Sequence, residues 1–494
     1  STVAEPAAGA DEIEFGTEQT VKAVYVWDGQ LSNTEAVSVI KGEYNIILNE
    51  PIQADTYSFV YNTDPTNVGE ASITLPYIVP TVSMRVYWGD TTSDRYEPGV
   101  TPSHTYPYPG QYRIQIEADD GFDDVRLFGV VNAIQRVDQW APQFRTSASG
   151  DGFTGDGLVN LINGQSFCGV IPPFKYTSLT SLSGAFYNCG RLLINNWDWV
   201  PYELNSCTSV AVSFYNACSI APDRTEALRL SFPQLQTSSA LTDVYNCFAN
   251  SKIKGWKNAS GTLTNQPFTN TASVTRWDNA FTNCDITSLS VDTISATSMK
   301  QTFYGNSWTT SPFFNAPNCT NFSSIFKNCN QMTTMNPSIA NSTYSNGTNF
   351  TSAWDGCSAL TTLPAYDFGN AIEMTNTFRY CSSLTTPPIT AFASSVTSVY
   401  ATYDQCSLLS GTHTFSGAGV TSMTAFARET AFTEVTLNMP NNTSLYFAFF
   451  NCPNLTTINF SNASTANVSD LRNAFHQATN LANFPNDMKF PALI

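Results

Sequence analysis

The sequence predicts a multidomain protein in which an all-β N-terminal part precedes an α/β solenoid of stacked repeats. Three observations predict it: a shift in charge near residue 140, alternating apolar residues before it, and a repeat built on aromatic residues after it. Residues 1–140 hold 21 acidic and 7 basic residues, a net charge of −14, whereas residues 141–494 hold 18 and 15, a net charge of −3. Such a change in composition is typical of a domain boundary, which we place at 132/133.

The composition excludes several classes of partner. The net charge is −17, and only 12% of the residues are charged. Nucleic acid and anionic membranes require clustered basic residues, so neither is expected as a partner. No apolar run reaches the roughly 18 residues of a membrane-spanning helix, so membrane insertion is not expected either. The three histidines, His104, His413 and His476, are scattered, which leaves little room for a histidine-based metal or general-base site.

The first 70 residues predict a flexible acidic tail and a small β-rich domain. Residues 1–20 are acidic and lack the apolar core of a signal peptide. Within residues 21–70, three runs are rich in β-branched and aromatic residues and are separated by turn residues: Val21–Asp28, Val37–Leu48 and Tyr57–Asn62.

Residues 71–132 predict a β-sandwich. Met84, Val86 and Trp88 alternate with polar residues before the turn at Gly89 and Asp90, and Tyr112, Ile114 and Ile116 alternate later. A period of two with turns between the runs is typical of such sandwiches.

This stretch resembles the polycystic-kidney-disease (PKD) type of immunoglobulin-like domain. The residues that match the motifs of that family are Trp88, Gly89, Asp90, His104, Tyr106, Gly110 and Tyr112. Thr91 departs from the family, which often has glycine there. The resemblance implies a spacer or adhesion module and no chemistry of its own.

Residues 133–494 contain about twelve repeats, each built on one aromatic residue that we call the anchor. The anchors are 22 to 34 residues apart: Phe186, Phe214, Phe248, Phe281, Phe303, Phe326, Trp354, Phe378, Tyr403, Phe426, Phe449 and Phe475. The residue four before the anchor is mostly apolar, and the residue just before it is usually small. Asn often lies two after it and Cys three after it.

These columns predict a short helix, a tight turn and a strand in each repeat. An apolar spacing of four places both residues on one helix face, and Asn tolerates the left-handed conformation that ends a helix. Examples of the following extended piece are LTTLPAYDF (360–368), FTEVTLNMP (432–440) and LTTINFSNA (455–463). Repeats of this length stack through a common core and a parallel strand ladder.

The repeat pattern resembles the BspA-like leucine-rich repeats of bacterial surface proteins. The resemblance rests on the register of many weak matches, and Val137-Asp138-Gln139-Trp140 after the PKD-like stretch strengthens it. It implies a leucine-rich-repeat-type solenoid that presents a binding face.

The twelve cysteines predict buried thiols more strongly than disulfides or a metal site. Seven share the column three after the anchor, and there is no Cys-x-x-Cys motif. The others are Cys168, Cys207, Cys218, Cys247 and Cys319; of these, Cys207 with Cys218 is the best disulfide candidate.

Other candidate chemistry is weak. The acidic loops 119–124 and 151–157 offer oxygen ligands for Ca²⁺ but lack EF-hand spacing, so solvated turns are the simpler interpretation. Asp355 and Asp404 both follow an anchor, two coils apart, and are the nearest approach to a glycosidase pair. We expect them to be solvated surface residues. No catalytic, metal-binding or cofactor-binding residue is assigned, and no cofactor is expected.

The column just after the anchor varies freely, which is typical of exposed positions. It holds Tyr187, Tyr215, Thr282, Tyr304, Lys327, Asp355, Arg379, Asp404, Phe450 and His476. It is either a recognition surface or plain solvent-facing variation, and the partner-binding residues stay unknown.

The sequence thus predicts a non-enzymatic structural or binding protein. The first hypothesis is a phage virion surface component, such as a fibre, appendage or decoration protein. It would attach to other virion proteins through the N-terminal β region and to a host-surface protein or glycan through its repeats. The alternative is a bacterial cell-surface adhesin, and a polysaccharide depolymerase is a weaker third. The sequence ends on the apolar Phe490–Ile494, so we expect either that another subunit or domain covers this end, as in a homo-oligomer or larger assembly, or that the true chain continues.

Overall fold

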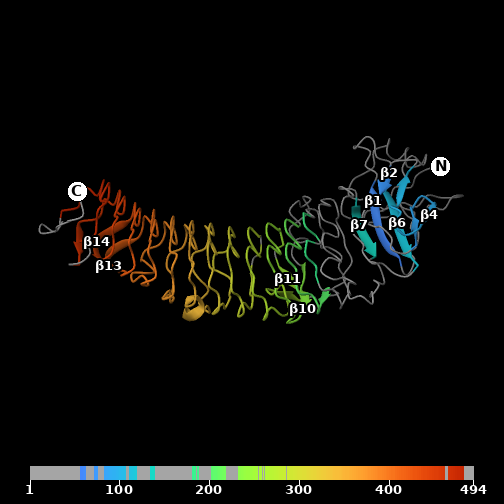
Figure 1. Ribbon diagram of the computed structural model, residues 1–494, viewed down its shortest axis with the longest axis horizontal. Coiled ribbons are helices and arrows are strands. Elements are labelled where there is room, and N and C mark those ends of the chain that lie inside the picture. The colour runs from blue at the N-terminus through green and yellow to red at the C-terminus, as the bar shows by residue number, and fades with distance from the viewer. Residues whose placement is uncertain are drawn as a thin grey trace, which may run out of the picture. The chain divides into compact units, whose positions relative to one another are not determined.

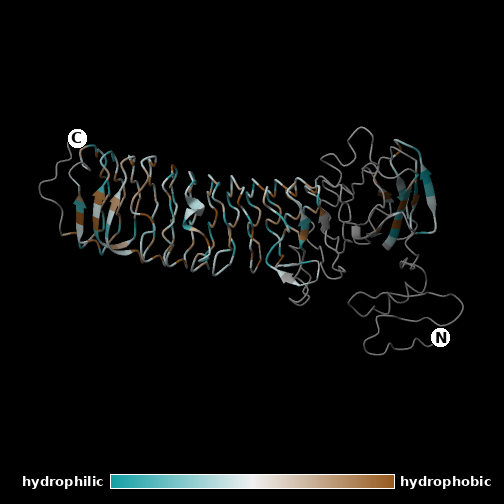
Figure 2. Ribbon diagram, turned by 90° about the horizontal axis from the view of Figure 1, so that it is seen from below, coloured by the Kyte–Doolittle hydropathy of each residue, from teal (hydrophilic) through white to brown (hydrophobic). Residues whose placement is uncertain are grey.

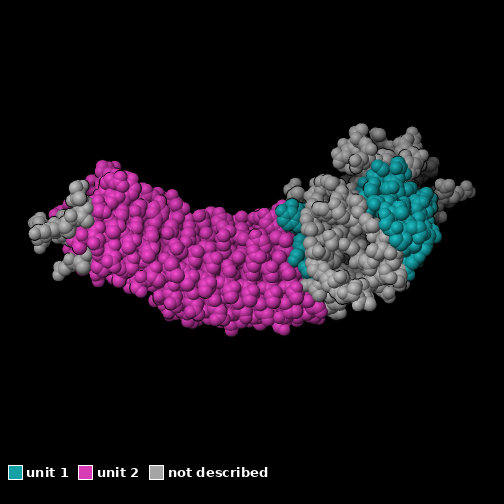
Figure 3. All heavy atoms as spheres, viewed as in Figure 1, with its two compact units in different colours: residues 1–200, 217–228 teal, residues 201–216, 229–494 magenta. Residues whose placement is uncertain are grey.

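The chain divides into two compact units, residues 1–200 with 217–228 and residues 201–216 with 229–494 (Figure 3). Each unit is described by itself. The computed structural model describes residues 56–62, 72–75, 83–106, 111–119, 134–139, 181–184, 186–188, 202–217, 232–253, 255–258, 260, 262–284, 286, 288–461 and 465–482. The predicted tail, the runs Val21–Asp28 and Val37–Leu48, and Phe490–Ile494 lie outside these residues.

Unit 1 contains a five-stranded antiparallel sheet with strand order β4-β3-β6-β1-β7 (Figure 1). Its strands are β1 (Tyr57–Asn62), β3 (Met84–Tyr87), β4 (Ser93–Tyr96), β6 (Gln111–Ala118) and β7 (Ile134–Gln139). A two-stranded antiparallel sheet joins β2 (Ser72–Thr74) to β5 (Ser103–Thr105). The larger sheet takes β1 from the predicted 21–70 segment and β7 from the predicted 133–494 segment, so its pairing spans both boundaries. The boundaries were predicted from residue composition, which does not show which strands, far apart in sequence, pair in one sheet.

Trp88, Tyr106 and Tyr112 of the PKD-like motif are buried in unit 1, and Asp90 and His104 are half-buried beside them; Gly110 lies outside the described residues. The Trp88 indole donates to the Asp94 carboxylate at 2.8 Å, and the Tyr106 hydroxyl donates to the Trp88 carbonyl at 3.0 Å. The His104 ring stacks on Trp88 at 4.8 Å between centroids, and its Nε2 lies 2.8 Å from the Asp90 carboxylate. A side chain at Gly89 would collide with the backbone of Arg113, which explains the glycine. The assignment to the PKD family itself stays a prediction.

Unit 2 is a stack of coils whose pairing from coil to coil is parallel, as the sequence predicts (Figure 1). Its short elements are β8 (Tyr202–Leu204), β9 (Phe232–Pro233), β10 (Leu235–Thr237), β11 (Trp256–Lys257), β12 (Leu263–Thr264) and the 3₁₀ helix η2 (Asn341–Tyr344). Near its end, β13 (Ser410–Ser416), β14 (Ala431–Asn438) and β15 (Thr457–Phe460) form a three-stranded parallel sheet. Of the three extended pieces given as examples, the second and third overlap β14 and β15, whereas 360–368 contains no strand.

The predicted short helix of each repeat is wrong. Among the described residues there is no α-helix, and the anchor lies in a ribbon of successive turns. Residues two before and two after each anchor have positive φ, for example Asn246 (52°) and Asn250 (58°) around Phe248. A right-handed helix cannot contain such residues, and a helical segment of about five residues is too short to be stable by itself.

The ribbon is held by hydrogen bonds between coils. The amides of Val244, Asn246, Phe248 and Asn250 donate to carbonyls of the next coil at 2.7–3.2 Å. The intervening amides of Cys247 and Ala249 close turns within the coil by donating three residues back. The ribbon's backbone groups are thereby bonded within their own coil or to a neighbouring coil, which makes the surface rigid.

The anchors form a continuous aromatic column inside the stack. Successive rings from Phe214 to Tyr403 lie 5.3–6.3 Å apart with planes within 27° of each other. Such pairs contribute about 0.5–1.5 kcal/mol each beyond the area they bury. Figure 2 shows hydrophobic and hydrophilic residues alternating along the coils.

One predicted anchor is in the wrong register. Positive φ at Ala425 and Glu429 places Ala427, not Phe426, at the anchor position. The bridges Ser398–Ser422 and Ser422–Ser444 agree, because each residue lies five before its anchor only if that anchor is Ala427. Met423 then fills the apolar position four before the anchor. Phe426 is buried and meets Tyr403 and Phe449 nearly at right angles, at 80° and 77°.

The cysteine side chains pack in the core and also donate hydrogen bonds to backbone carbonyls. The thiols of Cys329, Cys357, Cys381, Cys406 and Cys452 are free and buried. Each donates to the anchor carbonyl of the preceding coil at 3.0–3.2 Å. Asn306 and Thr430 occupy the same column: the Asn306 amide donates to the preceding anchor carbonyl at 2.8 Å, and the Thr430 hydroxyl donates to that of its own coil at 3.0 Å.

Candidate binding surface

The outward side of the turn ribbon carries the column just after the anchor, but not all of that column is exposed. Asp355 and Asp404 are each 1% exposed. The expectation that they are solvated surface residues is therefore wrong, and the cause is the basic residues that cover them. With the corrected register, the column runs Lys327, Asp355, Arg379, Asp404, Arg428 over successive coils.

The charges in this column alternate and pair. Lys327 and Arg379 both contact the Asp355 carboxylate at 2.9 Å, Arg379 with both Nε and Nη2. Arg428 forms the same bidentate pair with Asp404: Nε donates to Oδ1 at 2.8 Å and Nη2 donates to Oδ2 at 2.7 Å. The hydrogen bonds to the carboxylates raise the pKa values of both guanidinium groups despite partial burial. Two-pronged pairs of this kind also fix the direction of the arginine side chains.

This arrangement does not suit a glycosidase. A general acid or nucleophile must reach its substrate, whereas both carboxylates lie beneath guanidinium groups and have almost no exposed surface. The two aspartates also lie on coils separated by the coil of Arg379.

Two tyrosines on the coils of Arg379 and Asp404 are unusually exposed. Tyr380 and Tyr400 are 41% and 43% exposed. The Arg379 guanidinium lies 4.9 Å from the centre of the Tyr380 ring, and Tyr400 is close enough to Arg428 to raise its pKa. We call Tyr380, Arg379, Asp404, Arg428 and Tyr400 the tyrosine–guanidinium row.

The sequence reasoning missed most of this row. Tyr380 lies two after its anchor, where Asn is usual, and Tyr400 lies three before its anchor, where no single residue type is usual. Arg428 was missed because the register of its coil was wrong. The tyrosine at a usually small or polar position was the available signal.

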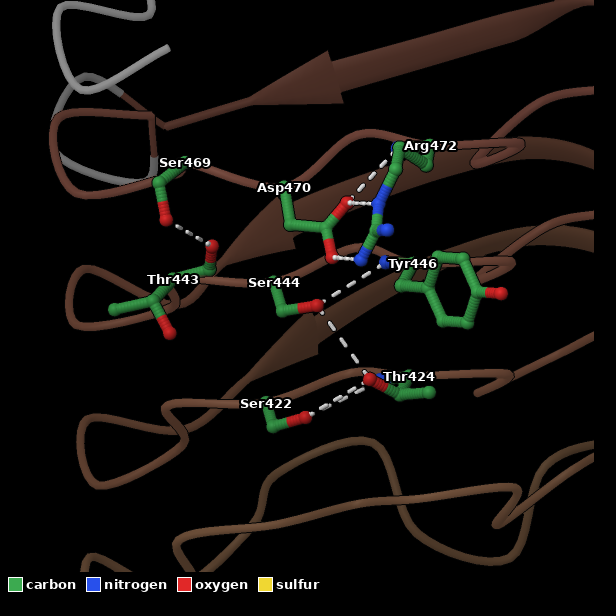
Figure 4. A network of polar contacts seen from close by, with 8 residues as sticks. All are labelled: Ser422, Thr424, Thr443, Ser444, Tyr446, Ser469, Asp470 and Arg472. Carbon is green, nitrogen blue, oxygen red and sulfur yellow. Dashed lines mark hydrogen bonds and ion pairs between the residues drawn. The ribbon is translucent and has the colours of Figure 1, made fainter. Parts of the chain in front are cut away.

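A second outward column consists of hydroxyl residues six before the anchor. Most of the threonine hydroxyls donate to the carbonyl of the same position in the preceding coil, for example Thr297 to Thr275 at 3.2 Å and Thr443 to Thr421 at 2.9 Å. Ile372 interrupts this column. Figure 4 shows its last step, Ser469 to Thr443, beside Arg472, which binds Asp470 at 3.0 and 2.9 Å and lies over the Tyr446 ring at 4.8 Å.

The remaining candidates are outside the described residues or without support. Cys218, most of the loop 119–124 and all of the loop 151–157 fall on residues that the structure does not describe, so the Cys207–Cys218 disulfide and both Ca²⁺ loops stay untested. Within the described residues, no cluster of His, Cys, Asp and Glu could hold a metal ion. A search of the same residues finds no helix with the length and apolar character needed to cross a membrane.

Comparisons with known proteins give weak similarities. No protein-family model and no curated protein matches the sequence. A leucine-rich repeat protein from Bacteroides ovatus is similar in structure over 74% of this chain and 80% of its own, with 11% identity and a TM-score of 0.36. One from Eubacterium ventriosum is similar over 85% and 98%, with 11% identity and a TM-score of 0.27. Because scores below 0.5 do not establish a common fold, the coil stack rests on the contacts described above.

Proposed function

We propose that this chain is a non-enzymatic binding protein that presents the outward side of its turn ribbon to a partner. The observation that carries the proposal is the contrast between the two sides of the ribbon. Inside, the columns repeat the same aromatic and thiol side chains. Outside, the column just after the anchor differs from coil to coil, yet the ladders of amide hydrogen bonds hold its backbone in fixed positions. Rigid scaffolds that carry variable side chains are suited to recognition because little ordering entropy is lost on binding.

The coil stack also agrees with the leucine-rich-repeat-type solenoid that the sequence pattern resembles. We propose this class for unit 2, with turns in place of the helices. A PKD-like spacer in unit 1 and attachment to other proteins through the N-terminal β region belong to the same proposal.

Two settings fit such a protein. Buried thiols that donate to backbone carbonyls favour folding in a reducing cytosol. This supports a phage virion surface component assembled inside the cell. A bacterial cell-surface adhesin is the alternative, favoured by the resemblance to BspA-like repeats. A larger assembly is proposed for either setting.

The test is a binding measurement combined with an activity measurement. Fluorescently labelled full-length chain is titrated onto a panel of bacterial cells and onto polysaccharides isolated from them, whose chain length is then measured. We expect saturable, reversible binding to at least one preparation and no change in chain length. Shortened polysaccharide would contradict a non-enzymatic role, and the absence of saturable binding to every preparation would contradict a binding role.

A further inference from the structure

We infer that the tyrosine–guanidinium row binds an uncharged polysaccharide, with sugar rings stacked on Tyr380 and Tyr400. This inference rests on the proposed binding function and names the chemical class of the ligand.

The two tyrosines are fixed platforms. The Tyr380 amide donates to the Asp404 carbonyl at 2.9 Å, and the Tyr400 carbonyl accepts from the Asn376 amide at 2.8 Å. Both rings therefore extend from backbone that is tied to the neighbouring coil, and both expose about two fifths of their surface. An aromatic face offers apolar area and a negative quadrupole, which suit the C–H face of a sugar ring.

The arginines on the same and the neighbouring coils supply hydrogen-bond donors near these platforms. Arg379 and Arg428 each use Nε and Nη2 to hold an aspartate. Within the described residues, the Nη1 groups have no hydrogen-bond partner, and the side chains are 28% and 32% exposed. A guanidinium carries five N–H donors in a fixed plane. The remaining donors are positioned to bind sugar hydroxyl or ring oxygens.

The charge balance selects against acidic ligands. Lys327, Arg379 and Arg428 are matched by Asp355, Asp404 and the neighbouring Glu429, which raises the pKa of Arg428 through its negative charge. These six groups together carry no excess positive charge, and residues 141–494 carry a net charge of only −3. An anionic polysaccharide would therefore gain little from long-range attraction. Uncharged hydroxyl groups, in contrast, need only directed donors.

The experiment uses the full-length chain on an array of neutral and acidic polysaccharides. Bound members are then examined by calorimetry with soluble fragments at 50 and 500 mM NaCl. The variants are Tyr380→Ala, Tyr400→Ala and their combination. Leu408→Ala is the matched control, because Leu408 is 56% exposed on the coil of Tyr403 but lies outside the row. Far-UV circular dichroism and thermal melting establish that each variant is folded.

We expect at least one neutral polysaccharide to bind with affinity that changes less than twofold between the two salt concentrations. Each tyrosine variant should lower that affinity at least tenfold, and Leu408→Ala should leave it within twofold. Tighter binding of an acidic polysaccharide that weakens with salt would overturn the inference, as would neutral binding that survives both tyrosine substitutions.

The cell-binding measurement separates the two levels of failure. If the double tyrosine variant binds cells as well as the unaltered chain, the binding function stands and the polysaccharide inference is overturned. If the unaltered chain binds neither cells nor any polysaccharide, both are overturned.

Discussion

At Thr91 the backbone adopts a left-handed conformation, with φ of 73°, at the position where PKD-type domains often have glycine. This conformation costs a residue with a Cβ about 1–2 kcal/mol relative to glycine. The Thr91 side chain is exposed, so little packing is lost when it is removed.

Thr91→Gly should therefore stabilise the protein by about 0.5 kcal/mol, because relief of strain exceeds the added freedom of the unfolded chain. Chemical denaturation of the full-length chain, followed by hydrogen exchange of strands β3 and β6 with mass spectrometry, measures this. Thr92→Gly is the control and should destabilise, since the Thr92 hydroxyl donates to Asp90. Equal losses from both substitutions would contradict the account of Thr91.

The paired charges make a second prediction for single residues. Arg428→Met leaves the buried Asp404 carboxylate without its guanidinium, which should cost about 2–3 kcal/mol, less than a fully buried pair because Arg428 is partly exposed. Replacing both partners in Arg428→Met with Asp404→Leu should recover most of this loss. Urea denaturation of the single and double variants is the measurement. A double variant as unstable as the single one would contradict the paired arrangement.

At the scale of the repeat, the hydroxyl column explains why threonine recurs six residues before the anchor. Ile372 is the exception: its amide donates to the Thr348 carbonyl at 2.8 Å, but it has no hydroxyl to donate there, and its side chain is 46% exposed. Ile372→Thr should stabilise by about 0.5–1 kcal/mol by adding the missing hydrogen bond. Thr421→Val removes the bond to Thr397 and should destabilise by a similar amount. Thermal denaturation of both variants tests the column; a loss from Ile372→Thr would refute it.

The cysteine column predicts how stability depends on pH. Burial raises the pKa of Cys329 to about 12, whereas an unfolded cysteine has a pKa of about 8.5. Below pH 8.5 both states are protonated, so the contribution is fully present. Above it the unfolded chain loses the proton first, and stability falls as pH rises towards 12.

Urea denaturation at pH 8 and pH 10 should therefore show lower stability at the higher pH, and Cys329→Ser should reduce the difference. Alkylation followed by mass spectrometry should leave Cys329, Cys357, Cys381 and Cys406 unmodified in the native protein and modified in denaturant. Rapid native labelling of these four would show that the thiols are not buried.

For the molecule as a whole, the repeat, its parallel stacking and the buried thiols could be predicted from sequence, because each leaves a column of one residue type. The turn ribbon could not. An apolar residue four before the anchor fits a helix as well as a ribbon, and only the positive φ at Asn246 and its counterparts separates them. Those positions hold Val212, Gln301 and Phe447 as well as Asn, so no single residue type marks them.

The candidate surface was harder to predict than the fold. Asp355 and Asp404 were found by their shared column, but the sequence does not show that arginines from adjacent coils would cover them. The sequence predicts Phe426 as the anchor because it is aromatic. The position of Met423 and the bridge at Ser422 show that Ala427 is the anchor. Hydrogen bonds between coils, which sequence letters do not encode, decided both cases.

Cysteine cross-linking between neighbouring coils tests the coil stack and its register most directly. The side chains of Ser422 and Ser444 both approach Thr424, at 3.2 and 3.4 Å (Figure 4), and the two residues form a parallel bridge. Neighbouring residues of a parallel ladder lie about 4.8 Å apart, which is within the Cα separation that a disulfide spans. The account predicts that Ser422→Cys with Ser444→Cys forms a disulfide on oxidation, detected by peptide mass spectrometry, whereas Thr421→Cys with Ser444→Cys does not. Cross-linking of the second pair but not the first would place Phe426 at the anchor, and cross-linking of neither would contradict the stack.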